Sequence, residues 1–540
     1  MSYLDVPRLH FSGKFIAQPS TLNNTPSNFD PATTQPVPLW NPNGNHTWQL
    51  VNCGVQSVVF ADGKSVYAPQ QINATVSSTD KPVTAKLVDL DTQQQLVSQI
   101  WGLRIKVAFS KTDYFVGDFR VVCFDDITFA RSKTGGGSSR ASAFFQSFLD
   151  NVEWGGYLTS PFLRQLQSVS PARLSVKFVV DGYDMNTKQG RVVGTIGPAW
   201  ADEPPNFVLG RALRVNRQFQ PEDSINYGYA RVDPIRKRLL VDLGNSIPTV
   251  RPGGPPPETL GTLEVVIGPS TSSPIALGKY DYSEAAYLHF AGIQEFPLDA
   301  KQLAALTNTP LGVRQTNATG AVTVPLQEGA NGTYVCATQQ VYRMNPSDTA
   351  SVELIALRFG QPAGGETIDL AQVTGSTQTI GPPPPPVGTP AAALTLPSSV
   401  TTGDDGRASF CLTASDPSNP RGFIDGQVYA VGYNWAADND PAFPADPWNF
   451  ISVLVHDSYE KAPTWANIQP ILQQYAKLYP FMDSIFQLDD PVVIQQNIAA
   501  FRMVLNIPVS DPRYMPVTRD MSRDKRQLIL EWLNLGAPTT

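Results

Sequence analysis

The chain has few of the side chains that commonly bind metals or act as catalytic nucleophiles. Its 540 residues include only four cysteines and four histidines. The cysteines are Cys53, Cys123, Cys336 and Cys411, and no two of them have the spacing of a zinc site. A chain of this length does not need disulfides to hold its core, so we expect reduced, buried thiols. One or two disulfides remain an alternative. No metal site is expected.

Charged residues and long apolar runs are also scarce. Only 16% of the residues are charged, the net charge is −7, and the sequence has no basic run. Nucleic acid and anionic membranes are therefore poor partners. The N-terminus lacks the apolar core of a signal peptide, and no apolar stretch is long enough to span a bilayer. We therefore expect a soluble cytoplasmic protein.

Common catalytic signatures are missing. The sequence has no Gly-x-Ser-x-Gly motif, no dinucleotide fingerprint and no kinase signature. The glycine-rich stretch 135–139 is not followed by the Lys-Ser/Thr of a phosphate-binding loop. The adjacent carboxylates at 125–126, 404–405 and 489–490 fall next to turns, where such pairs are usually solvated or cap a helix. His456 and Glu460 are spaced for an ordinary surface contact rather than a metal site.

Proline and glycine, by contrast, are abundant, with 48 and 40 residues. So many turn formers favour short strands over long helices, and the length suggests about three or four folding units. The sequence predicts a mainly β, α+β multidomain protein with a helical C-terminal segment. Its predicted parts are a β-rich domain over 1–335, a small immunoglobulin-like β-sandwich over 351–435, and a helical segment over 446–540 that packs on the β region.

The first part should contain mostly strands, with two helical interruptions. Strands are predicted over 9–17, 48–60, 114–124, 174–180, 191–196, 239–243 and 263–267, the fourth and fifth forming a hairpin. Gly13 inside the first strand is typical of a bulge or a close approach. A helix is predicted over 140–150, because Phe144, Phe145, Phe148 and Leu149 recur at helical intervals, and a second over 298–306, with Asp299 near its start.

The later parts have equally regular signals. Sandwich strands are predicted over 352–359, 367–370, 392–396, 408–413 and 426–433, and the proline run 382–386 is expected to be a spacer. Amphipathic helices are predicted over 465–479, 491–505 and 520–535, the last with Gly536 after its end.

Three positions stand out as site candidates from the residue patterns alone. By the alternation of a strand, His10 points away from Leu9 and Phe11. It is expected either to bond a neighbouring backbone group or to act as an acid/base or a haem ligand. Tyr514 and Arg519 precede the last helix in a polar cluster, which an N-cap at Thr518 or Asp520 explains in part and a ligand contact would also explain.

Several motifs resemble one enzyme family. Tyr479-Pro480-Phe481-Met482, Phe486-x-Leu488 and Tyr514-Met515-Pro516-x-Thr518-Arg519 are similar to a segment of the iminophenylpyruvate dimer synthases, the violacein-pathway and chromopyrrolic-acid synthases of bisindole biosynthesis. So are the opening stretch 5–13, Asn45-His46-Thr47-Trp48, and the stretches 194–196 and 210–213. The matches run in order along nearly the whole chain.

This resemblance implies oxidative coupling of two amino-acid-derived imines, with haem in the chromopyrrolic-acid branch. It adds His46 to the candidates His10, Tyr514 and Arg519. The chain departs from the family in two ways. It stops at Thr540, before the family's ferritin-like half, and residues 90–94 replace an aromatic and histidine stretch. The resemblance therefore covers the N-terminal half of such an enzyme, and a partner protein would supply the other half.

Two functional hypotheses follow. In the first, the chain is an oxidative enzyme, or an enzyme component, of specialised metabolism that acts on a small molecule. In the second, it is a non-catalytic binding or assembly module that acts with a partner. A pocket that gathers His10, His46 and Tyr514 would favour the first, and a large exposed apolar patch would favour the second.

Overall fold

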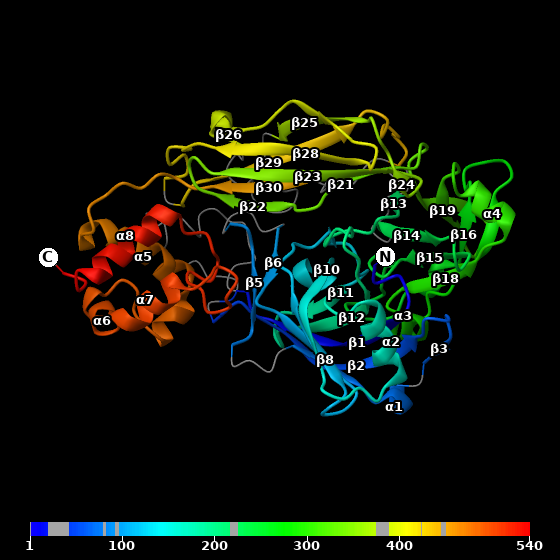
Figure 1. Ribbon diagram of the computed structural model, residues 1–540, viewed down its shortest axis with the longest axis horizontal. Coiled ribbons are helices and arrows are strands. Elements are labelled where there is room, and N and C mark those ends of the chain that lie inside the picture. The colour runs from blue at the N-terminus through cyan, green and yellow to red at the C-terminus, as the bar shows by residue number, and fades with distance from the viewer. Residues whose placement is uncertain are drawn as a thin grey trace.

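The computed structural model describes residues 2–19, 41, 43–67, 69–78, 83–91, 97–216, 225–373, 388–422, 424–443 and 450–539. These residues form a mainly β structure whose longest helices gather near the C-terminus, as predicted (Figure 1). The proline run 382–386 and residues 92–94 lie outside the described residues, so the expectations placed on them stay predictions.

The first sheet closes on itself. Strand β1 pairs with both β12 and β2, so that eight antiparallel strands make a ring in the order β1-β12-β11-β10-β8-β7-β4-β2. These strands are β1 (Arg8–Ala17), β2 (Thr47–Val59), β4 (Thr75–Ser78), β7 (Arg104–Ala108), β8 (Tyr114–Phe119), β10 (Ser142–Trp154), β11 (Leu174–Asp184) and β12 (Gln189–Pro198). The short strands β3 (Ser65–Val66), β5 (Ala85–Val88), β6 (Gln99–Trp101) and β9 (Asp126–Thr128) extend the sheet.

A large apolar core fills the ring. Helix α2 (Pro161–Val169), capped by Ser160, adds Phe162, Leu163 and Leu166 to it. The predicted bulge at Gly13 is confirmed, because the pairing of β1 with β2 shifts register there. A Cβ on Gly13 would lie 2.5 Å from Cα of Cys53, so only glycine permits this close approach.

The helix predicted over 140–150 is wrong, because these residues belong to strand β10. Both faces of this strand are covered. Phe145 and Leu149 enter the core of the ring, whereas Phe144 packs in a separate cluster outside it. A strand buried on both faces loses the alternation of apolar and polar residues, and its aromatic residues can then imitate a helical spacing.

The second sheet lies beside the ring. Its eight strands run in the order β17-β16-β19-β20-β13-β14-β15-β18. They are β13 (Arg211–Val215), β14 (Gly228–Asp233), β15 (Arg238–Asp242), β16 (Thr262–Ile267), β17 (Ile275–Tyr280), β18 (Ile293–Pro297), β19 (Leu311–Thr316) and β20 (Val322–Gln327). Helix α3 (Glu284–Phe290) lies near strand β1, and α4 (Ala300–Ala305), with a capping box at Asp299, confirms the helix predicted there.

Two five-stranded sheets form a sandwich above the ring (Figure 1). One sheet contains β21 (Thr333–Ala337), β23 (Thr349–Arg358), β24 (Gln361–Pro362), β26 (Leu394–Thr395) and β28 (Arg407–Ala414). The other contains β22 (Val341–Met344), β25 (Thr367–Val373), β27 (Ser399–Thr401), β29 (Gln427–Trp435) and β30 (Phe450–Val455). Strand β30 lies in the segment predicted to be helical from 446, so the helices begin later in the chain than expected.

The helical segment has a core of its own. It contains α5 (Trp465–Leu478), α6 (Pro491–Gln496), α7 (Ile498–Asn506) and α8 (Arg523–Asn534). The helix predicted over 491–505 is broken at Asn497, which ends α6 and begins α7. The cap of α8 is Ser522, whose hydroxyl accepts from the backbone of Lys525, so the predicted caps Thr518 and Asp520 are wrong.

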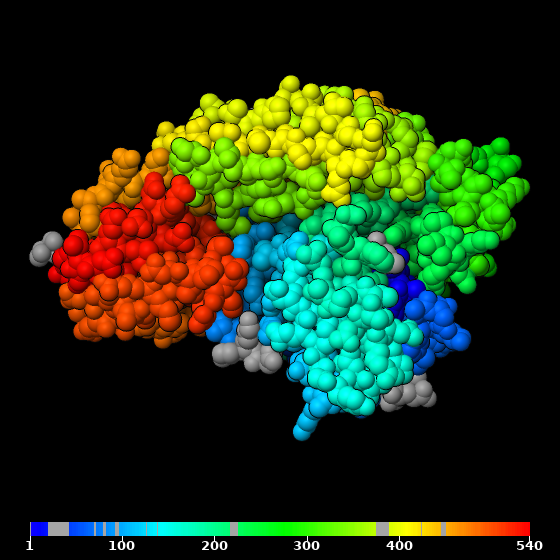
Figure 2. All heavy atoms as spheres, viewed as in Figure 1, coloured from blue at the N-terminus to red at the C-terminus, as the bar shows by residue number. Residues whose placement is uncertain are grey.

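The helical segment sits at one end of the molecule and touches both the sandwich and the ring (Figure 2). Asp425, just before β29, accepts a hydrogen bond from the backbone of Ser522 and lies 3.4 Å from Nζ of Lys525. On the side of the ring, the Arg519 guanidinium lies 4.7 Å from the ring centre of Trp101. In the part of the chain that the structure describes, no helix is long and apolar enough to cross a membrane.

Candidate functional site

His10 lines neither of the two cavities described below. It is fully buried on the outer side of the ring, where Nδ1 lies 2.9 Å from Oγ1 of Thr195 and Nε2 accepts from Nε of Arg8 at 3.3 Å. The ring of Phe290 meets it edge-on at 5.9 Å. Burial, and then the charge of Arg8, lower the pKa of His10 well below its usual value. His10 thus bonds two side chains rather than the neighbouring backbone group that we expected of a structural residue.

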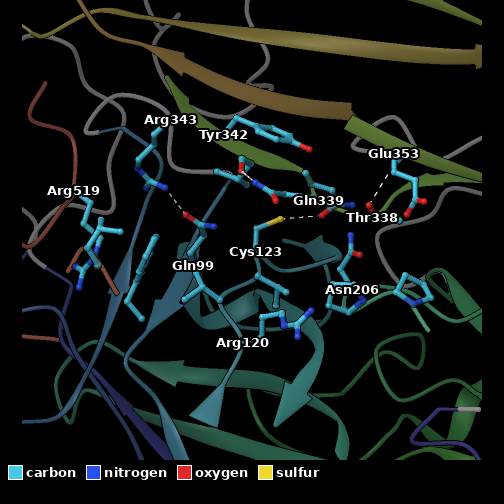
Figure 3. A pocket seen from close by; sticks show the side chains of 18 of the residues that line it. Gln99, Arg120, Cys123, Asn206, Thr338, Gln339, Tyr342, Arg343, Glu353 and Arg519 are labelled. Atoms are coloured by element: carbon cyan, nitrogen blue, oxygen red, sulfur yellow. Dashed lines mark hydrogen bonds between the residues drawn. The ribbon is translucent and has the colours of Figure 1, made fainter. Parts of the chain in front are cut away.

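Tyr514 and Arg519 do line a cavity. A polar cleft of about 880 Å³ lies where the ring, the sandwich and the helical segment meet (Figure 3). It is rich in charged side chains, which are Arg120, Arg343, Arg407, Arg519, Arg523, Arg526, Asp202, Glu203 and Glu353. Six guanidinium groups against three carboxylates give the cleft an excess of positive charge.

Arginines and aromatic rings are interleaved at the end of the cleft nearest the helical segment. The guanidinium groups of Arg343 and Arg519 lie 5.5 and 4.7 Å from the ring centre of Trp101. Those of Arg519 and Arg526 lie 5.7 and 5.6 Å from the ring centre of Tyr514. Arg526 also donates to the phenol oxygen of Tyr514 at 2.6 Å. We call these five residues the arginine–aromatic cluster.

Arg519 is held by the loop that carries it. Its backbone has a φ of 57°, and its side chain donates to the carbonyl oxygens of Val509 and Asp511, each at 2.9 Å, and to that of Val517. Burial, and then the charge of Arg343, lower the pKa of Arg519 to about 9. The side chain therefore shapes the loop and at the same time brings a positive charge to the cleft.

The opposite end of the cleft contains its carboxyl groups. Glu353 pairs with Arg407 at 2.9 Å, and the buried Glu203 accepts from Oγ of Ser175 at 2.9 Å. Burial raises the pKa of Glu203 to about 8. Cys123 lies between the two ends and donates to Oε1 of Gln340 at 2.9 Å. Because burial raises the pKa of this thiol, it is a poor nucleophile.

A second cavity, of about 330 Å³, lies inside the helical segment. Its walls are almost entirely apolar. They comprise Leu472, Tyr475, Tyr479, Phe481, Met482, Ile485, Phe486, Leu488, Ala500, Phe501, Val504, Leu505, Met515, Pro516, Val517 and Met521. The chain near β2 and β5 closes one side with Gly44, Asn45, His46 and Lys86. This is the size and lining of a small-molecule pocket.

His46 and Lys86 are the basic side chains that line this apolar cavity. Nδ1 of His46 lies 2.9 Å from the carbonyl oxygen of Leu87, and the ring of Tyr479 meets the imidazole at 5.4 Å. Burial lowers the pKa of His46 to about 4, so the imidazole is neutral at pH 7. Nζ of Lys86 donates to the carbonyl oxygen of Asn45 at 2.9 Å, and burial lowers the pKa of this lysine to about 8.

The two cavities share one wall, the segment 509–521. Tyr514 and Arg519 face the polar cleft, whereas Met515 and Val517 face the apolar cavity, and Met521 lines both. Of the sequence candidates, the structure thus places Tyr514 and Arg519 in one cavity and His46 in the other. No described cavity gathers His10, His46 and Tyr514, so this observation, which would have favoured the enzyme hypothesis, is not made.

The haem implied by the family resemblance does not fit these residues. Haem needs a wide apolar slot and an axial side chain that the iron can approach. Of the four histidines, all of which the structure describes, His46 lines the apolar cavity, but the ring of Tyr479 packs against its imidazole. The cavity of about 330 Å³ is also near the lower limit for small organic ligands.

Other expectations had mixed outcomes. The four cysteines are free and three are buried, but Cys411 is exposed, contrary to the expectation for all four. His456 does not make the expected surface contact, because it is buried 3.5 Å from Asp425. Asp490 caps α6, as expected for a carboxylate beside a turn. Among the residues with described positions, no group of three or more His, Cys, Asp or Glu side chains could hold a metal ion.

Comparisons with known proteins do not assign the chain to a family. No protein-family model matches the chain, and no curated protein does. The S-layer protein rSbsC is 8% identical with a TM-score of 0.15, over 72% of this chain and 51% of that one. Three N-terminal domains of the bacteriophage RB49 outer capsid protein Hoc are 8% identical with a TM-score of 0.15, over 70% and 99%. A Salmonella alpha-2-macroglobulin is 8% identical with a TM-score of 0.17, over 98% and 35%.

Proposed function

We propose that the chain binds a small aromatic molecule in the apolar cavity and acts as an enzyme component of specialised metabolism, similar to the N-terminal part of the iminophenylpyruvate dimer synthases. One observation carries the proposal. Three motifs that resemble the family contribute to the lining of this one cavity, with Tyr479, Phe481, Met482, Phe486, Leu488, Met515 and Pro516. A motif that only stabilised the helices would not need to gather around an empty space of about 330 Å³.

The lining supports an aromatic ligand. Tyr479, Phe486 and Phe501 offer ring faces and edges, and the methionines add polarizable side chains that adapt to a flat ligand. At the polar side, the amine of Lys86 can pair with a carboxylate beside the neutral imidazole of His46. A ring with a short polar tail, such as an arylpyruvate or its imine, matches this arrangement.

Filling the cavity should abolish binding. Ala500 lines the cavity, whereas the adjacent Ala499 on the same helix is exposed, so the two positions form a matched pair. We expect Ala500→Phe to weaken the binding of phenylpyruvate or indole by about tenfold or more, since the new ring occupies the ligand's space. Ala499→Phe should leave binding within about twofold. Isothermal titration calorimetry on the full chain measures both.

A thermal unfolding curve checks that both variants are folded. If the native chain binds neither probe saturably, the proposal fails. It also fails if Ala499→Phe weakens binding as much as Ala500→Phe, because the loss would then not come from the cavity.

The second candidate is an assembly module whose partner supplies a ferritin-like half. Exposed apolar side chains on the helical segment favour it, namely Ile485, Val492, Met503, Val509 and Leu535, which are 44 to 66% exposed. Exposed apolar groups of this kind often mark partner surfaces. Affinity capture from the native source with the unmodified chain and with Met503→Glu tests it. A helical partner recovered by both equally would rule out Met503 as part of such a surface.

A further inference from the structure

The arginine–aromatic cluster, Arg343, Trp101, Arg519, Tyr514 and Arg526, brings three guanidinium groups together around two aromatic rings. In the part of the chain that the structure describes, no carboxylate forms an ion pair with any of its three arginines. The other arginines of the same cleft differ, since Arg407 pairs with Glu353 and Arg523 with Asp348. The cluster is thus the part of the cleft in which added negative charge would be most favourable.

The carboxylates nearest the cluster are already engaged. Asp91 pairs with Arg421 at 2.9 Å, and Asp511 pairs with Arg513 at 2.7 Å. Asp520 accepts from the hydroxyl groups of Thr518 and Tyr475. None of the three forms a direct ion pair with a described guanidinium group of the cluster, although, against the burial that lowers the pKa of Arg343, the charges of Asp520, Asp91 and Asp89 act to raise it.

Two buried N–H groups of the cluster also lack an acceptor. Among the described residues, Nε of Arg343 and Nε1 of Trp101 have no hydrogen-bond partner, although the other nitrogens of Arg343 donate to Oε1 of Gln99 at 2.7 Å and to the carbonyl oxygen of Asp89 at 3.2 Å. Trp101 is only 9% exposed. A buried donor without an acceptor costs stability, and both side chains line the cleft.

We infer that the cleft holds a binding site for an oxyanion, carboxylate or phosphate, at Arg343 and Trp101, with Arg519 and Arg526 contributing charge. Excess donors and positive charge on one wall of a cavity of about 880 Å³ leave room for the rest of an organic ligand. The interleaved Tyr514 and Trp101 rings keep the guanidinium groups in place without satisfying their charge. This site does not depend on the apolar cavity.

Inorganic phosphate and malonate are suitable probes, and calorimetry on the full chain measures their binding. Trp101→Phe keeps the aromatic ring but removes the unpartnered N–H, and Arg343→Gln removes the charge. We expect each change to weaken binding by about tenfold. The matched control is Arg523→Gln, which removes a paired arginine from the same cleft and should change the affinity by less than about twofold.

The outcomes separate the possible sources. Stronger binding of phosphate indicates a phosphate ester as the natural ligand, and stronger binding of malonate indicates a carboxylate. Absence of saturable binding by both probes overturns the inference, and so does an equal loss in Arg343→Gln and Arg523→Gln, which would reflect general charge. Ala500→Phe should retain oxyanion binding, so failure of the proposed function and failure of this site are distinguishable.

Discussion

Lys177 is a lysine with no exposed surface, on strand β11 of the ring. Its ammonium donates to Oδ1 of Asp242 at 3.0 Å and to the carbonyl oxygen of Ala291 at 2.7 Å, and Tyr3 donates to the other oxygen of Asp242 at 2.8 Å. Because β11 belongs to the ring and Asp242 to the second sheet, this buried pair joins the two sheets.

Removing the ammonium should be costly. In Lys177→Met, the carboxylate of Asp242 stays buried without its cation, and we expect the free energy of unfolding to fall by about 3–5 kcal/mol. Urea unfolding followed by tryptophan fluorescence measures the change. Lys64→Met is the control, since Lys64 forms an exposed pair with Asp62, and it should change stability by less than about 0.5 kcal/mol. Equal effects of the two changes would contradict the importance of the buried pair.

At the same scale, the sequence predicted some site residues and could not predict others. Tyr514 and Arg519 were found because a run of polar residues precedes a helix. Trp101 and Arg343 carry no such signal, because each is a single residue in a short strand and they meet only through the tertiary fold. Nothing in the spacing of the sequence indicates that β6 and β22 would lie at the same cleft.

At the scale of elements, the junction of the helical segment with the sandwich depends on Asp425. It accepts from the backbone of Ser522 at the start of α8 and lies 3.5 Å from Nδ1 of His456 and 3.4 Å from Nζ of Lys525. Burial alone would raise the pKa of Asp425, but the imidazole and the ammonium outweigh it and hold the pKa well below the usual value of 3.8.

This shift makes the junction sensitive to acid. A carboxylate whose pKa is lower in the folded than in the unfolded protein stabilises the fold at pH values above its unfolded pKa, near 3.8. That stability is lost as the pH falls through the pKa of the folded state. We therefore expect the free energy of unfolding of the helical segment to fall below about pH 4, and to fall less in Asp425→Asn. Urea unfolding followed by the helical circular dichroism signal measures it. Asp405→Asn, in an exposed turn, should keep the full pH dependence.

Asp457 faces the same junction and acts in the opposite sense. Burial raises its pKa, so its contribution is fully present while it is protonated and decreases as the pH rises. If the dependence of stability on pH is unchanged in Asp425→Asn but altered in Asp457→Asn, the acid sensitivity comes from Asp457. That result would contradict the role of Asp425.

Helices and strands could be predicted from the sequence where one face is exposed to solvent and the other is buried. From Ala408 to Ala414, strand β28 alternates between buried and exposed residues, and α5 and α8 each bury one stripe, so their patterns could be recognised in the sequence. Strand β10 was misread because both of its faces are covered. The break at Asn497 was also missed, since the apolar stripe continues on both sides of it.

At the scale of the whole molecule, separate apolar cores fill the ring, the second sheet, the sandwich and the helical segment. Among the described residues that are buried in the helical core, Ile424 alone precedes α5 in the sequence. The helical segment is therefore tied to the rest chiefly by polar contacts, of which the Asp425 junction is one. Such a part of a protein can open without global unfolding.

A change in the helical core should accordingly stay local. Trp532 is fully buried on α8, stacks on Trp465 at 5.4 Å and donates to the carbonyl oxygen of Pro538 at 2.9 Å. We expect Trp532→Ala to destabilise the helical segment by about 3–5 kcal/mol, because it leaves a large cavity. Hydrogen–deuterium exchange should then rise in α5, α7 and α8 but not in β11 and β12. Trp200→Ala, at a position 44% exposed, should raise exchange in neither part, and faster exchange throughout the ring in Trp532→Ala would show instead that the cores unfold as one unit.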